Sequence, residues 1–375
     1  MTKRYTSTTL KKNNTKNVLK YIYTKRKATP HSVEEYLGLS RPTVAQILKD
    51  LTEEGFIAQE GYARSTGGRK ANIFSFNMSN KIAIGVELRI DHVEITAINL
   101  FFNMLKYDTV HIGFNTSDEY FDEVSLIIQN FIDSLNVPHE TILGIGIGLQ
   151  ALVSADGKTI VYGKVLDCTG LSISKFTDRL PYRCVFNHDA ESFANAELWL
   201  DKTLVNAIFF NIHEHLSGTV IINRSFPRGR ELKSGVFEHM TLVPNGKKCY
   251  CGKKGCVNAY CSFSALTGPD DDIESFFLSL REEDDSAVKG WNEYLGCLAA
   301  AIDNIHMILP YDVILGGKIA KFLTQEDIDA LHKLVHARSA FPSDDRYIGI
   351  SKATNLPLCV GAAIPLVNKY LEKIC

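Results

Sequence analysis

A short segment rich in cysteine constrains this chain more than any other feature. Between His239 and Ser262 the sequence reads HMTLVPNGKKCYCGKKGCVNAYCS. Structural zinc takes four Cys or His ligands in a tetrahedron, and glycines inside such a loop let the chain turn sharply. The residues whose spacing lets one Zn²⁺ gather them are His239, Cys249, Cys251 and Cys256. The segment therefore predicts one structural Zn²⁺ per chain.

The alternative for this segment is a set of free thiols or disulfides. Four of the nine cysteines fall between positions 249 and 261. The first 17 residues, MTKRYTSTTLKKNNTKN, are polar and basic and do not resemble a secretory signal, which disfavours disulfides. No segment approaches the roughly 20 apolar residues that a membrane span needs. We expect a soluble, cytoplasmic protein that binds metal and no membrane.

The net charge of −2 conceals a strong asymmetry along the chain. Residues 1–80 hold 14 Lys and Arg against 6 Asp and Glu, whereas residues 81–375 hold 27 against 37. A basic module is thus joined to a larger acidic one, which is typical of a nucleic-acid-binding head. A solvated basic tail is the alternative.

The first 60 residues have the hydrophobic periodicity of three helices. Ser32 begins an S-x-x-E pattern that predicts a capped helix from Val33 to about Leu37, ending at Gly38. Ser40 is expected to cap the third helix. The apolar positions at helical spacing are Val18, Leu19 and Ile22 in the first helix and Val44, Ile47, Leu48 and Leu51 in the third. The pattern predicts a helix-turn-helix.

The outer face of the third helix carries long or polar side chains that can reach base edges and phosphates in a major groove. These side chains are Arg41, Thr43, Gln46 and Lys49. Helical hairpins with polar outer faces are common, so this face alone does not decide between DNA binding and a solvated surface.

Two strand-like runs follow the third helix, the first beginning at Phe56 and the second ending at Phe76. They predict a wing whose tip carries Arg69 and Lys70. Narrow A·T-rich minor grooves have enhanced negative potential, which gives Arg69 a physical reason to lie at this tip. A plain hairpin turn is the alternative to this DNA contact.

The rest of the chain alternates strand-like and helical runs, which favours a two-lobed α/β body. The expected strands are 82–90, 93–101, 143–153, 182–189, 207–212 and 313–317. The expected helices are 120–134, 190–200, 262–266, 273–280, 291–309 and 362–373.

The string CYCGKKGC resembles the CxCGxxGC signature of the ROK family, which comprises bacterial sugar kinases and sugar-responsive repressors. SGVFEHM matches the family's GExGH segment, so the resemblance implies His239 as the fourth metal ligand. The GGR of the wing resembles an element of ROK repressors. The implied fold is an N-terminal winged helix-turn-helix, residues 1–78, on an actin-like (ribonuclease H-like) body. Its first lobe would span 79–200 and its second lobe 201–375, with a C-terminal helix returning to the first.

The chain departs from the family at the phosphate-binding loop. ROK kinases carry a DxGGT loop whose backbone amides cradle ATP phosphates. The matching residues run from Glu87 to Asp91, and every glycine is gone. Negative charge at Glu87 and Asp91 is expected to repel phosphate, and Leu88 and Ile90 to block the amides. We therefore expect no enzymatic activity and no catalytic residues.

The resemblance also implies an effector pocket. FNHDAES matches the family's sugar-binding NDAN segment, with His188 in place of Asn and Asp189 retained. Val236 replaces the GExGH glutamate, and Asn258 replaces a glutamate after the cysteine motif. The implied effector-binding residues are His188, Asp189, His239 and Asn258. Alternatively, Asp189 merely caps the following helix.

These patterns together predict a zinc-containing repressor of sugar-metabolism genes. It would bind a palindromic double-stranded operator as a homodimer or higher homo-oligomer, because one such head contacts few base pairs. Its body would sense a sugar or sugar derivative. The alternatives are a sugar kinase with an added DNA-binding head and a ROK-type regulator without a sugar effector.

Overall fold

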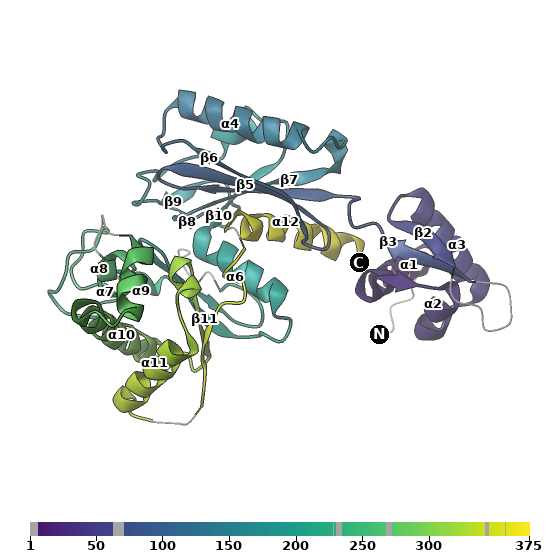
Figure 1. The fold of residues 1–375 in the computed structure, drawn as a ribbon. Coiled ribbons are helices and arrows are strands. Elements are labelled where there is room, and N and C mark those ends of the chain that lie inside the picture. The colour runs from purple at the N-terminus through teal and green to yellow at the C-terminus, as the bar shows by residue number, and fades with distance from the viewer. Residues whose placement is uncertain are drawn as a thin grey trace.

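The computed structural model describes residues 7–62, 71–227, 229, 235–267, 272–341, 345–356 and 358–375. Figure 1 shows a small, mainly helical head beside a larger body that contains two sheets flanked by helices. Among the described residues, no helix is long and apolar enough to cross a membrane.

The head contains three helices and a small antiparallel sheet. Its elements are α1 (Ser7–Lys25), α2 (Pro30–Leu37), α3 (Arg41–Glu53) and three strands in the order β1 (Lys27–Ala28), β3 (Asn72–Phe76), β2 (Ile57–Tyr62). Every apolar position named above for the first and third helices is buried. The tip of the wing, with Arg69 and Lys70, lies outside the described residues.

The start of α2 differs from the sequence expectation. Thr29, not Ser32, is the N-cap, and its hydroxyl accepts a hydrogen bond from the Ser32 amide at 3.2 Å while the Ser32 hydroxyl accepts one from the Thr29 amide at 3.0 Å. Pro30 can begin the helix because the first helical position needs no amide donor. Gly38 ends α2 in the left-handed conformation, as expected.

The first lobe is built on a five-stranded sheet in the order β10 (Cys184–His188), β7 (Ile142–Leu149), β4 (Ile82–Leu88), β5 (His92–Asn99), β6 (Met104–His111). Helix α4 (Asp118–Asp133) covers one face and α12 (Leu358–Ile374) the other (Figure 1). A small hairpin, β8 (Leu152–Val153) with β9 (Ile160–Tyr162), follows β7, and the short α5 (Ser174–Thr177) precedes β10. Strand β6 was not among the expected strands; it lies at the edge of the sheet and its residues are mostly exposed.

The second lobe is built on a four-stranded sheet in the order β12 (Leu216–Ile221), β11 (Ala207–Ile212), β13 (Asp312–Gly316), β14 (Ile348–Ile350). Its helices are α7 (Asn258–Cys261), α8 (Ser264–Thr267), α9 (Ile273–Arg281), α10 (Asp285–His306) and α11 (Gln325–Arg338). Helix α10 begins earlier than expected because Asp284 caps it, its carboxylate accepting from the Ala287 amide at 2.9 Å. Helix α6 (Asp189–Leu200) packs against α12 and both β11 and β12.

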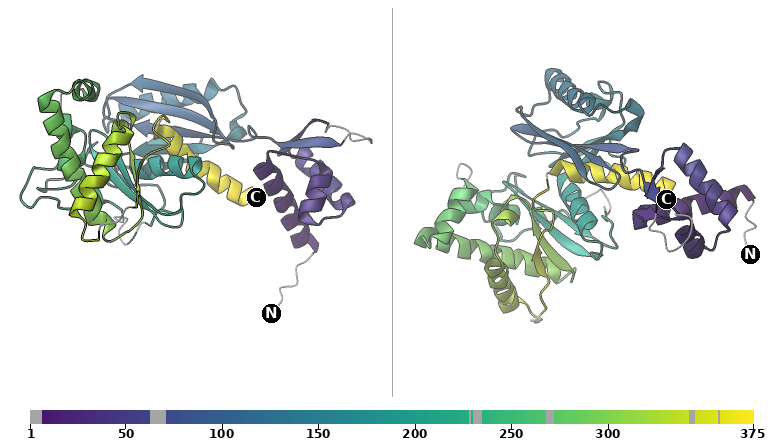
Figure 2. Two further views of the ribbon diagram at one scale, coloured as in Figure 1. Left: turned by 60° about the horizontal axis from the view of Figure 1, so that its bottom comes forward. Right: turned by 45° about the vertical axis from the view of Figure 1, so that its right-hand side comes forward.

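Helix α12 fits closely into the body and then continues to the head. A Cβ at Gly85 or Gly146 would lie 1.8 or 2.0 Å from an α12 carbonyl oxygen, and one at Gly361 would lie 1.9 Å from a carbonyl oxygen of α6. Both views in Figure 2 place the end of α12 beside the head. The core of the head also continues into the body, since the rings of Tyr23 and Phe101 lie 5.2 Å apart.

Candidate metal and effector site

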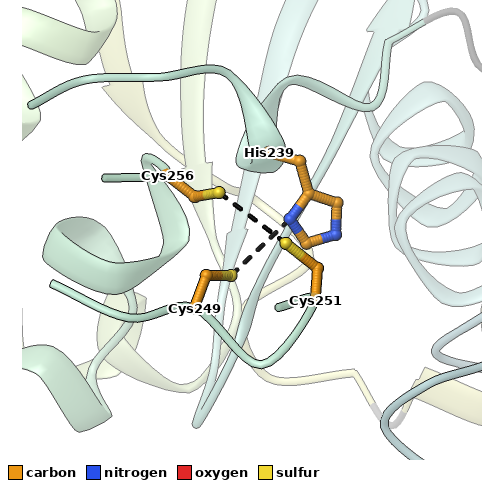
Figure 3. Close-up of side chains that lie close together, drawn as sticks. All are labelled: His239, Cys249, Cys251 and Cys256. Atoms are coloured by element: carbon orange, nitrogen blue, oxygen red, sulfur yellow. Dashed lines mark hydrogen bonds between the residues drawn. The ribbon is translucent and has the colours of Figure 1, made fainter. Parts of the chain in front are cut away.

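The structure brings the four predicted metal ligands together (Figure 3). His239 ends the short helix η3 (Phe237–His239), and the three cysteines lie on the loop that follows. The four ligand atoms all lie within 4.8 Å of one another. Cys261, which the sequence analysis did not count as a ligand, is buried elsewhere and its carbonyl accepts a hydrogen bond from Tyr294.

The distances in this cluster fit a tetrahedral zinc site. With Zn–S bonds of about 2.3 Å, two sulfurs of a tetrahedron lie about 3.8 Å apart. The Sγ atoms of Cys251 and Cys256 are 3.7 Å apart, and Cys249 Sγ is 3.7 Å from His239 Nδ1. The loop requires glycine at 255, where φ is +81° and a Cβ would lie 1.8 Å from the Val243 carbonyl oxygen.

The protonation of these groups also suits a cation. Burial lowers the pKa of His239, which keeps the imidazole neutral and able to bind metal. Burial raises the pKa of the Cys256 thiol to about 12, so a bound cation is needed to hold its thiolate at neutral pH. Asn258 supports the cluster from behind: its amide nitrogen lies 3.7 Å from Cys249 Sγ, and its oxygen accepts from the Leu216 amide at 2.7 Å.

A pocket of about 460 Å³ lies beside this cluster, between segments of the two lobes. The first-lobe lining comes from the β8–β9 hairpin, its flanking residues and His188 at the end of β10. The second-lobe lining comes from the segment around η3 and from Tyr250 of the metal loop. The lining residues are Gln150, Ala151, Leu152, Val161, Tyr162, Lys164, Val165, His188, Val236, Glu238, His239 and Tyr250.

Tyr250 and Glu238 are among the lining residues that were not anticipated from the sequence. Tyr250 places its hydroxyl 3.2 Å from His239 Nε2, which joins the metal loop to the pocket. Glu238 is 4% exposed, and its Oε2 accepts a hydrogen bond from the Gly218 amide at 3.2 Å. Burial raises the pKa of Glu238 to about 8. Glu238 thus supplies a carboxyl group to the pocket, where Val236 replaces the family's glutamate. Its position directly before His239 in the sequence could have identified it.

Asp189 lies beneath the pocket, 2% exposed, and is not part of its lining. Its Oδ2 accepts hydrogen bonds from Ser217 at 2.9 Å and from Asn211 at 3.3 Å. Its Oδ1 lies 3.3 Å from His188 Nε2. The N-cap of α6 is His188 and makes no side-chain capping bond, so the carboxylate of Asp189 is directed at β11, β12 and His188 rather than at the helix end.

The segment that replaces the family's phosphate loop differs from the sequence expectation. Glu87 is 0% exposed, and burial raises the pKa of its carboxyl group well above the usual value. It therefore does not present negative charge to solvent, and that part of the expectation is wrong. Leu88 is buried within β4, paired with Val93, and the Arg89 amide donates to the His92 carbonyl at 3.0 Å. The Arg89 amide is thus used by the turn that joins β4 to β5.

A second cavity of about 360 Å³ adjoins the first, sharing Gln150 and Val165 with it. The Arg89 guanidinium enters it, 3.9 Å from Glu87 Oε1 and 3.7 Å from Glu214 Oε2. Lys318 pairs with the same Glu214 at 3.5 Å. Both cations of this cavity therefore share the carboxylate of Glu214.

The predicted outer face of α3 is at the surface. Arg41, Gln46 and Lys49 are exposed and Thr43 is half-buried. Gln46 donates to Asp50 at 2.6 Å, and the ammonium of Lys49 lies 3.8 Å from Glu53. Both partners are on the same helix, so a nucleic acid can compete for these donors without unfolding the head.

Comparison with known proteins adds a family and a fold. A model of the ROK family matches residues 83–363. A putative xylose repressor of Caldicellulosiruptor is 21% identical over 380 residues, covering 94% of this chain and 95% of that protein. The xylose repressor of Bacillus subtilis is 27% identical over 262 residues, covering 69% and 68%. A crystal structure of a ROK family transcriptional regulator, a homologue of the Escherichia coli MLC protein, superposes with a TM-score of 0.77 at 18% identity, covering 97% of this chain and 98% of that one. The predicted fold class is confirmed.

Proposed function

We propose that this chain, which belongs to the ROK family, is a transcriptional repressor that binds operator DNA through its head and senses a sugar or sugar derivative in its body. Support comes from relatives named xylose repressors, one of which matches 94% of the chain, head included. We assign residues 1–78 to the DNA-binding domain, 79–200 to the first lobe and 201–375 to the second. The protein would act in the cytoplasm.

The observation that carries the DNA-binding proposal is the exposed polar face of α3 on a basic head. Arg41, Thr43, Gln46 and Lys49 would enter the major groove, and Arg69 and Lys70 of the wing would contact the minor groove. Operator symmetry generally mirrors protein symmetry, so the DNA-bound form would be a homodimer or higher homo-oligomer on a palindromic site.

A kinase with an added head is the less supported alternative. The relatives named above are repressors. In the segment where a kinase needs free amides for phosphate, Leu88 lies in a paired strand and the Arg89 amide is bonded to His92. The protein is therefore best described as a regulator and not an enzyme.

Zinc would be a structural component of the sensor. His239, Cys249, Cys251 and Cys256 would hold one Zn²⁺ per chain, which neutralises the thiolates and fixes the loop that carries Tyr250. The fit of the 3.7 Å sulfur separation to a tetrahedron supports this assignment. The ion would hold His239 at the pocket wall without taking part in chemistry.

The effector would bind in the 460 Å³ pocket, against His188, Glu238 and His239. Asp189 would act from beneath by orienting His188. An effector changes DNA binding only if it binds one arrangement of lobes and head better than the other. Helix α12 would carry that difference, because it packs against β4, β7 and α6 near the pocket and its last turn contacts the head.

Selection of duplexes from a random library by the full-length protein, followed by sequencing, tests the DNA proposal. We expect enrichment of an inverted repeat, and loss of enrichment with Arg41→Ala plus Gln46→Ala. Lys333→Ala, an exposed change on α11 far along the chain, serves as the control. Equal enrichment by the double variant would reject α3 as the reading helix.

A further inference from the structure

Part of the pocket lining is aliphatic and offers no hydrogen-bond partner to a sugar hydroxyl. Val161 is 44% exposed although it is an aliphatic residue of a paired strand, and Leu152 on the neighbouring strand is half-buried. Val165, just beyond β9, extends the same wall, and Val236 belongs to the second-lobe lining. Exposed aliphatic groups gathered in a concave site indicate that an apolar part of a ligand covers them.

Polar groups that can bind a sugar ring lie on both sides of the pocket, and Gln150, Tyr162 and Lys164 lie beside the aliphatic side chains. Glu238, His239 and Tyr250 come from the second lobe, and His188 stands at the end of β10. Below them, Asp189 holds an Oδ1 that lacks a hydrogen bond among the described residues and faces His188.

The size of the pocket also exceeds one sugar ring. Pockets of roughly 300–1,000 Å³ enclose ligands of drug size, and the volume here is about 460 Å³. A single pentose or hexose bound at the polar groups would leave the aliphatic side chains of Leu152, Val161 and Val165 in contact with water only.

We propose that the effector is a glycoside with an apolar substituent on its anomeric oxygen, not a free monosaccharide. The sugar ring binds at His188, Glu238 and His239, and the substituent packs against Leu152, Val161 and Val165. The inference rests on the proposed sugar-sensing function and names its ligand class. The apolar contact gives the selectivity, since each buried methylene-sized group adds to affinity whereas the hydroxyl contacts are common to all members of a sugar series.

Isothermal titration calorimetry with the full-length, zinc-loaded protein tests this proposal. The probes are xylose and glucose and their methyl and phenyl β-glycosides, with phenol as the control for the ring alone. We expect the phenyl glycoside of at least one sugar to bind at least about tenfold more tightly than its methyl counterpart. Phenol alone should not bind.

Val161→Asn should reduce this advantage, because it should weaken binding of the phenyl glycoside more than binding of the methyl glycoside. The matched control is Val205→Asn, because Val205 is 45% exposed and does not line the pocket. Equal affinity for methyl and phenyl glycosides, or an advantage that Val161→Asn does not reduce, would overturn the proposal while leaving sugar sensing intact. Absence of binding by every sugar and glycoside would reject both the glycoside proposal and sugar sensing. Operator selection would still test DNA binding by the head separately.

Discussion

The side-chain ammonium of Lys16 donates a hydrogen bond to the carbonyl oxygen of Lys373, with an N···O distance of 2.7 Å. This bond joins α1 of the head to the last turn of α12, where helix carbonyls lack intrahelical donors and attract cations. Asn80, which lies between β3 of the head and β4 of the body, also contacts α12: the Tyr370 hydroxyl donates a hydrogen bond to its side-chain oxygen at 3.3 Å. Glycines hold the start of α12 tightly against β4, β7 and α6, so this one helix joins the core of the body to α1.

Loss of this contact should uncouple the effector from the operator. Lys16→Met removes the donor but keeps the length of the side chain, so operator affinity without effector should stay within about threefold. The change in operator affinity caused by a saturating glycoside should shrink toward none. Fluorescence anisotropy on a labelled operator measures both quantities.

Lys12→Met is the control for charge on α1, because Lys12 is exposed on the same helix. Deletion of residues 371–375 is a second test, since it removes the last turn of α12 altogether. Full effector response in both the Lys16 variant and the deletion would exclude α12 as the coupling element.

Zinc content should match the geometry of the cysteine cluster. The purified protein should contain about one zinc per chain, and Cys251→Ser should lower both zinc content and melting temperature because metal-binding energy is also folding energy. Cys297→Ser is the control, since that thiol is half-buried outside the cluster. Elemental analysis and thermal melting report the result; a melting temperature unaffected by complete chelation would contradict a structural role.

Gln46 and Lys49 on the outer face of α3 should affect DNA binding differently, Gln46 through a base and Lys49 through a phosphate. Gln46→Ala should change the preferred operator sequence, because an amide can read an adenine through two hydrogen bonds. Lys49→Ala should weaken all sequences alike and reduce the slope of log affinity against log salt by about one. Salt titrations on the selected operator and on a scrambled one distinguish these effects, and identical profiles for both variants would show that neither side chain enters the groove.

The buried carboxyl of Glu87 should make stability fall as the pH rises. Burial raises its pKa in the folded state, opposed by Arg89 and reinforced by Asp189 and Glu94, so the folded state holds a proton that the unfolded state releases above about pH 4.5. The loss should approach about 1.4 kcal/mol per pH unit above that point, until the folded-state pKa is reached.

Glu87→Gln keeps the shape and removes the titration, so its unfolding free energy should vary less steeply between pH 5 and 8 than that of the wild type. Glu123→Gln, an exposed change on α4, should follow the wild type. Denaturant unfolding across this range compares the three slopes. A wild type and Glu87→Gln variant with parallel profiles would show that Glu87 is ionised in the folded state.

The clustering of the three cysteines and the buried face of α3 were predictable because their geometry is set by local sequence. Three ligands lie within eight positions, from Cys249 to Cys256, and the buried positions of α3 follow helical spacing. The capping of α2 was misjudged although it is local too, since Thr29 and Ser32 both suit a cap and only the position of Pro30 decides between them.

The contacts around the pocket were harder to predict from the sequence because they depend on strand pairing. Asp189 meets Asn211 and Ser217 only because β11 and β12 pair antiparallel and bring these two residues opposite each other. Asn258 was expected in the pocket, but it begins α7 outside the lining, and its side chain contacts Cys249 Sγ and the Leu216 amide. Likewise, an isolated sequence does not tell whether Glu87 faces solvent or the interior of a sheet.

Asp189 should control effector affinity through the proton of His188. A carboxylate oxygen 3.3 Å from His188 Nε2 favours the tautomer that carries its proton on Nε2, which leaves Nδ1 as an acceptor. In Asp189→Asn the amide oxygen can still accept from Ser217 and Asn211, but the amide nitrogen then faces Nε2 and reverses the roles of the two ring nitrogens. A hydroxyl that donates to Nδ1 in the wild type would lose its acceptor, so affinity for the best-binding glycoside should fall roughly tenfold.

Ser217→Ala is the matched control, because it removes one donor to Asp189 Oδ2 and leaves Oδ1 facing His188. Its effect on affinity should be smaller than that of Asp189→Asn even if its effect on melting temperature is equal. His188→Ala should cost at least as much affinity as Asp189→Asn, and the double variant should cost no more than His188→Ala, since the two residues act through one imidazole. Additive losses in this cycle, or an unchanged dissociation constant in Asp189→Asn, would show that the carboxylate does not act through His188.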